Sequence, residues 1–60
     1  MLNMPASISI LYVDDEPCQL ELDRQFLEST GEFVVSTAES VDNARNMLSI
    51  KAFNVIVSDY

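Results

Sequence analysis

The chain has 60 residues, one cysteine, and ten acidic against three basic residues, which give a formal net charge of -7. A chain of this size forms one domain at most, with a small core, because it buries only about 60% of the surface that its unfolded form exposes. The lone cysteine excludes an intramolecular disulfide and the class of disulfide-stapled secreted miniproteins. The acidic balance disfavours direct binding to nucleic acid or to anionic membranes. With no signal-like or membrane-spanning stretch, we expect a soluble cytoplasmic protein with a flexible leader at residues 1–7.

The first two predicted elements are a strand and a helix. Residues 8–13 are mostly β-branched or apolar, and they are followed abruptly by the acidic pair Asp14-Asp15 and then by Glu16 and Pro17. This pattern predicts a buried strand that ends in a polar loop. Pro17 suits the first position of a helix, where its missing N–H costs nothing, and the acidic residues before it match the positive end of the helix dipole. Gly31 stands where a left-handed cap is favourable. We therefore expect a helix over about 17–30.

An apolar stripe marks one face of this expected helix. Cys18, Leu22 and Phe26 recur every four residues, and Leu20 and Leu27 widen the apolar arc. Cys18 on this stripe is expected to pack in the core rather than to serve in redox chemistry.

A second strand, a second helix and a third strand follow. Residues 33–38 are again rich in β-branched side chains, which predicts a short strand. Ser40 is a plausible N-cap for a helix that ends around Ala52, since apolar residues recur at helical spacing between them. Residues 54–60 contain three consecutive β-branched residues, which favour a strand buried on both faces.

The predicted order, strand–helix–strand–helix–strand, is typical of the α/β class, with a parallel sheet and right-handed crossovers in a three-layer αβα arrangement. Two helices cannot cover both faces of such a sheet fully, so we expect the third strand to keep an unpaired apolar edge. The segment would then belong to a longer domain, or would complete its sheet with a second copy or a partner. Self-association through the exposed edge is one of these expectations.

Three carboxylates fall where α/β sheets bind ligands. Asp14 and Asp15 follow the first strand and Asp59 follows the third, and ligands of open α/β sheets lie beyond the carboxyl ends of the strands. If these strands are neighbours, they lie about 4.8 Å apart and the carboxylates crowd into one pocket, where like charges either raise the pKa of a carboxyl group or recruit a cation. Magnesium fits better than zinc, because the chain has no histidine and only one thiol.

The two acidic signatures, ILYVDDEP before a helix and NVIVSDY at the end of the third strand, resemble those of response-regulator receiver domains in two-component phosphorelay signal transduction. The resemblance covers residues 8–60, about the first half of such a domain, and implies a flavodoxin-like strand order. It further implies that Asp59 is the phosphoacceptor, that Asp14 and Asp15 hold Mg²⁺ with Asp59, and that the partner is a histidine kinase or a phosphotransfer protein. The chain would be a signalling phosphoprotein rather than an enzyme.

Parts of the family pattern fall outside this sequence. Receivers have a Ser or Thr after the fourth strand and a Lys after the fifth, both in contact with the phosphoryl group, and a carbonyl two residues beyond the phosphoacceptor that binds magnesium. Lys51 is no substitute for that lysine, since it is expected late in the second helix, away from the pocket. Asn54 stands where the family often has Asp, a difference of little weight.

Two other interpretations compete with this one. An acidic pair before a helix is, by itself, more often a solvated cap than a ligand set. Haloacid-dehalogenase-type hydrolases place a second Asp two positions after their nucleophile, but here Glu16 occupies that position after Asp14, and the match at Asp59 would go unexplained. A half-receiver that cannot be phosphorylated and acts as an interaction fragment remains the alternative function.

Overall fold

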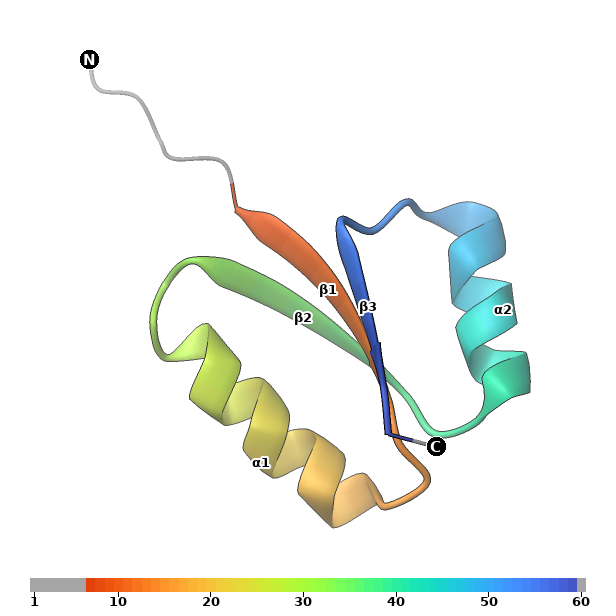
Figure 1. Cartoon of the computed structure of the whole chain (residues 1–60), viewed down its shortest axis with the longest axis horizontal. Helices are drawn as coiled ribbons and strands as arrows, with labels where there is room; N and C mark the ends of the chain where they lie inside the picture. The colour runs from red at the N-terminus through yellow and green to blue at the C-terminus, as the bar shows by residue number, and fades with distance from the viewer. Residues whose placement is uncertain (1–6, 60) are drawn as a thin grey trace.

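A computed structural model describes residues 7–59, so most of the leader and Tyr60 lie outside the described residues. The elements in chain order are β1 (Ile8–Val13), α1 (Pro17–Glu28), β2 (Phe33–Ala38), α2 (Val41–Ile50) and β3 (Val55–Ser58) (Figure 1). The predicted order is confirmed, and β1 and β2 have the predicted bounds. Both helices end about two residues before the predicted positions. In this range, neither helix has the length and apolar character needed to cross a membrane.

The three strands form one parallel sheet in the order β2-β1-β3. β1 is the central strand: it pairs with β2 along its whole length, from Ile8↔Phe33 to Val13↔Ala38, and with β3 from Ile10↔Val55 to Val13↔Ser58. The two helices lie on either side of this sheet (Figure 1). The chain therefore has an α/β fold with a three-stranded parallel sheet and two helices, compatible with a truncated flavodoxin-like fold.

The helices begin at residues whose chemistry favours it. Pro17 occupies the start of α1, which ends at Glu28 with Ser29 as its C-cap. Gly31, two residues beyond the cap, is in the left-handed region (φ +80°), where the absence of a Cβ removes the steric cost. Ser40 caps α2, because its hydroxyl accepts a hydrogen bond of 3.1 Å from the backbone N–H of Asn43.

The core is divided by the sheet into two small parts. On the α2 face, a cluster centred on fully buried Leu11 comprises Leu11, Val13, Ala38 and Ala44, with Met47 and Phe53 packed against it. Side chains alternate between the two faces of a strand, so Ile10 and its partner Val35 point to the α1 face, where Leu20 is also buried. Burial on both faces of β1 explains why this strand is the most apolar part of the sequence.

The predicted apolar arc of α1 is right for Leu20, which is buried, and for Leu27, which is half-buried. It is wrong for the stripe on the opposite side of the helix, where Cys18 is exposed and Leu22 and Phe26 have 61% and 74% of their surface exposed. The physical reason is the position of α1, which lies mainly over β2 rather than over β1 and β3. The stripe therefore faces away from the part of the sheet that the helix covers.

A second correction concerns β3, which was expected to be buried on both faces. Val55 is 44% exposed and Ile56, which points to the other face, is 52% exposed. Among the elements of residues 7–59, only β1 has its backbone close to that of β3. The expectation that this strand keeps an apolar edge is confirmed, and the missing cover is the reason that its β-branched residues stay in contact with solvent.

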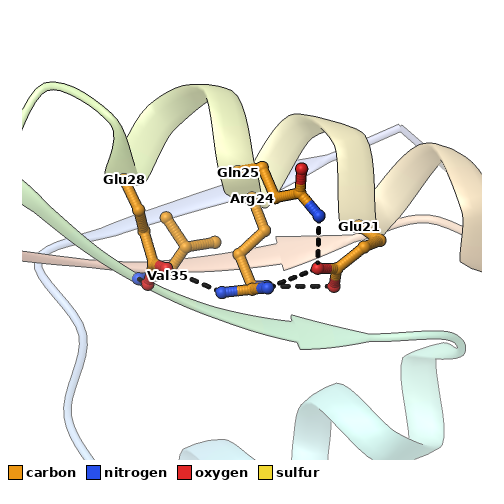
Figure 2. Close-up of polar contacts among 5 residues, drawn as sticks. All are labelled: Glu21, Arg24, Gln25, Glu28 and Val35. Atoms are coloured by element: carbon orange, nitrogen blue, oxygen red, sulfur yellow. Dashed lines mark hydrogen bonds and ion pairs between the residues drawn. The ribbon is translucent and has the colours of Figure 1, made fainter.

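Glu28 fastens α1 to the outer edge of β2 (Figure 2). One carboxylate oxygen accepts a hydrogen bond of 3.0 Å from the backbone N–H of Val35, and the other pairs with Arg24 at 2.7 Å. Arg24 also pairs with Glu21, which in turn accepts from the side-chain amide of Gln25. The last turns of the helix are thereby tied to the strand that follows it.

Candidate functional site

The carboxyl ends of β1 and β3 lie side by side and place Asp14 next to Asp59. Val13 pairs with Ser58, and the backbone N–H of Asp59 donates to the carbonyl of Val13 at 2.9 Å. The N–H of Asp14 donates on the other side to the carbonyl of Ala38 at 3.1 Å. The condition on which the sequence argument depended, that the first and third strands are neighbours, is confirmed.

Asp14 is held firmly at this edge. Only 4% of its surface is exposed, and its Oδ1 accepts a hydrogen bond of 3.1 Å from the backbone N–H of Glu16. A buried carboxylate needs hydrogen-bond partners to offset its lost hydration. The bond to Glu16 supplies one, and it also holds the loop between β1 and α1 in place. Asp15 and Asp59 are exposed. Of the three predicted carboxylates, Asp14 is therefore buried and holds the loop, whereas Asp15 and Asp59 face solvent.

Tyr12 and Asp23 adjoin the site and were not singled out from the sequence. The pKa of Tyr12 is raised above 10.0, first by hydrogen bonding to the carboxylate of Asp23 and by burial, then by the negative charges of Asp23, Asp59 and Asp14. The negative charges of three carboxylates, one of them on α1, therefore act on Tyr12. The spacing of Tyr12 two residues before Asp14, on the same face of β1, was the signal available in the sequence.

The donor chemistry at this edge suits a hard cation, since carboxylate oxygens are the ligands that Mg²⁺ prefers. Within residues 7–59, however, no three His, Cys, Asp or Glu side chains are gathered closely enough to hold a metal ion. Asp14 and Asp59 share an edge, while Asp15 begins the turn into α1. The three-carboxylate magnesium site therefore stays a prediction that would require side-chain rearrangement on binding.

Lys51 lies at the opposite end of the sheet. It follows the last residue of α2, before the amino end of β3, and its ammonium stands over the ring of Phe53 at 5.2 Å from the centroid. The path of the chain from α2 into β3 is visible in Figure 1. Within one molecule this cation is far along the strand from Asp59, as expected from the sequence.

The fold and the acidic edge define a small α/β protein with a parallel sheet and polar residues at the carboxyl ends of its strands. Comparison with family models, curated proteins and solved structures gives no match for this chain.

Proposed function

We propose that this chain is the N-terminal half of a response-regulator receiver domain and that Asp59 accepts a phosphoryl group from a histidine kinase or a phosphotransfer protein. The observation that carries the proposal is the adjacency of β1 and β3, which brings Asp14 and Asp59 to one edge of the sheet. The order β2-β1-β3 also agrees with the first three strands of the flavodoxin-like order 2-1-3-4-5.

The chemistry proposed for Asp59 is in-line phosphoryl transfer. A carboxylate oxygen of Asp59 attacks the phosphorus, the bond from phosphorus to the imidazole nitrogen of the donor breaks, and an acyl phosphate is formed. The exposure of Asp59 supports this role, since a donor protein can reach it. Mg²⁺, for which Asp14, Asp15 and Asp59 are the proposed ligands, would supply the positive charge that offsets the phosphoryl oxygens.

The function of an interaction fragment is the second candidate, and the exposed β3 favours it. An unpaired apolar edge strand is a template for pairing with another chain. The absence of a gathered three-ligand set among residues 7–59 is also consistent with a segment that does not hold phosphate by itself.

The test is intact-mass spectrometry after incubation with acetyl phosphate or a kinase and Mg²⁺. A protein that joins this segment to the later Ser or Thr and Lys of the family pattern should acquire a phospho-adduct, and Asp59→Asn should abolish it. Glu39→Gln is the matched control, because it removes the same charge from another exposed position. The 60-residue chain alone should be modified much less, since the groups expected to clamp the phosphoryl oxygens are absent from it.

Asp15→Ala should weaken Mg²⁺ binding and slow the transfer while the fold stays intact, because removing one charge from an acidic cluster relieves repulsion. Metal binding is measured by calorimetry and the fold by circular dichroism. A stable adduct on the Asp59→Asn protein, or none on its unmodified parent, would remove Asp59 from the proposed role.

A further inference from the structure

Asn54 joins the start of β3 to β1. Its side-chain Oδ1 accepts a hydrogen bond of 2.8 Å from the backbone N–H of Ser9, and its own backbone N–H donates to the carbonyl of Ser9 at 2.9 Å. The two residues lie one position before the first register pair of these strands, Ile10↔Val55. The side chain of Asn54 therefore supplies an acceptor to Ser9 just outside the ladder between the two strands.

The apolar pattern of β3 does not select its register. Residues 55–57 are consecutive β-branched residues, so a shift of one residue replaces one such side chain by another on each face of the sheet. The same shift moves Asp59 about 3.3 Å along the sheet and turns its side chain to the opposite face. Asp59 would then lose its backbone bond to Val13 and its place beside Asp14. The acidic edge therefore depends on a specific contact that holds β3 in one register.

The contact between Asn54 and Ser9 is satisfied in the observed register and is lost when β3 shifts by one residue. The N–H of Ile8 points to β2, where it donates to the carbonyl of Glu32 at 3.0 Å, whereas the N–H of Ser9 points to β3. Because peptide groups alternate between the two sides of a strand, the N–H of Ile10 points to β2 again. A shift of one residue in either direction sets Asn54 opposite Ile8 or Ile10 and leaves its Oδ1 without a donor.

We infer that Asn54 is a positioning residue for Asp59: it sets the register of β3 on β1 and so places the carboxylate of Asp59 beside Asp14. Asn54 lies five residues before Asp59, about 16 Å away along an extended strand, so it acts through the strand and does not touch a phosphoryl group. The consequence for phosphoryl transfer rests on the proposed function, whereas the register does not.

The test is amide hydrogen exchange of the 60-residue chain, followed residue by residue by NMR. Asn54→Ala removes the acceptor for Ser9. We expect the N–H of Asp59, at the far end of β3, to exchange at least about threefold faster, which corresponds to the loss of one partly exposed neutral hydrogen bond. The N–H of Asp14, which donates to Ala38 of β2, reports opening of the rest of the sheet and should exchange as in the unmodified chain.

Two variants separate the register from a general loss of stability. Asn54→Asp keeps an Oδ1 acceptor and should restore the exchange rate of Asp59 to within about twofold of the unmodified chain. Asn46→Ala makes the same substitution as Asn54→Ala at an exposed position of α2 and should leave that rate unchanged.

Four results would overturn the register role of Asn54. They are an unchanged exchange rate at Asp59 in Asn54→Ala, equal acceleration at Asp14 and Asp59, no rescue by Asn54→Asp, and an Asp59 amide that is unprotected in the unmodified chain.

The consequence for transfer is tested in a protein that joins this segment to the later Ser or Thr and Lys of the family pattern. With acetyl phosphate and Mg²⁺, Asn54→Ala should slow formation of the Asp59 adduct at least about twofold, because Asp59 is out of place in a larger share of molecules, and Asn54→Asp should restore the rate. An unchanged rate in Asn54→Ala, together with faster exchange at Asp59, would overturn the effect on transfer. The lack of an adduct on the unmodified protein would refute the proposed function itself, while the exchange rates alone decide the register.

Discussion

Truncating Glu28 to alanine removes the side chain that joins α1 to β2, and the structure allows its cost to be worked out. The carboxylate accepts from the Val35 N–H at 3.0 Å, and one third of the Glu28 side chain is exposed. A hydrogen bond to a charged group contributes about 1.5 to 3 kcal/mol when well buried, so partial exposure places this one near the low end. We expect Glu28→Ala to lower the free energy of unfolding by about 1.5 kcal/mol.

Two variants separate this bond from the general effect of charge. Glu28→Gln keeps an oxygen acceptor for Val35, as a neutral hydrogen bond of about 1 kcal/mol, and should lose only about 0.5 kcal/mol. Glu21→Ala removes a second carboxylate that pairs with Arg24 but does not reach β2, so its effect should be much smaller.

The assay is urea unfolding followed by circular dichroism at one fixed protein concentration, with amide hydrogen exchange at Val35 as the local readout. The Val35 amide should exchange faster in Glu28→Ala than in Glu28→Gln. Equal destabilisation by Glu28→Ala and Glu21→Ala, with unchanged exchange at Val35, would refute the reasoning.

Three further predictions follow from the helices and the core. The pKa of Glu21 is lowered from 4.5 to about 2, first by its hydrogen bond with Arg24. Its stabilising effect is therefore present above pH 4.5 and is lost as the pH falls towards 2; in an NMR titration, Arg24→Gln should return the Glu21 midpoint towards 4.5. Ser40→Ala should cost about 1 kcal/mol in urea unfolding, since it leaves the Asn43 N–H without its cap. Leu11→Ala should cost about 3 kcal/mol, enough to remove cooperative unfolding from a chain this small, which calorimetry would detect.

Local signals in the sequence determined most of the secondary structure. Pro17 and Ser40 mark where the helices begin, and the β-branched runs mark the strands, because these preferences act within a few residues of the chain. The placement of Asp14 and Asp59 at strand ends was likewise readable from their position after apolar runs. The alternation of strands and helices was enough to predict a parallel sheet.

Only the tertiary structure decided which faces are covered. The sequence-based prediction placed Leu20 in one arc with Leu22 and Phe26, although positions 20 and 22 lie about 200° apart around a helix. Helical spacing alone cannot choose which of the two sides is buried. The choice depends on where the helix lies on the sheet, over β2, where Glu28 reaches Val35. The exposure of β3 was decided in the same way, because burial of a strand depends on neighbours that are distant in the chain, and β-branched residues favour a strand whether or not those neighbours are present.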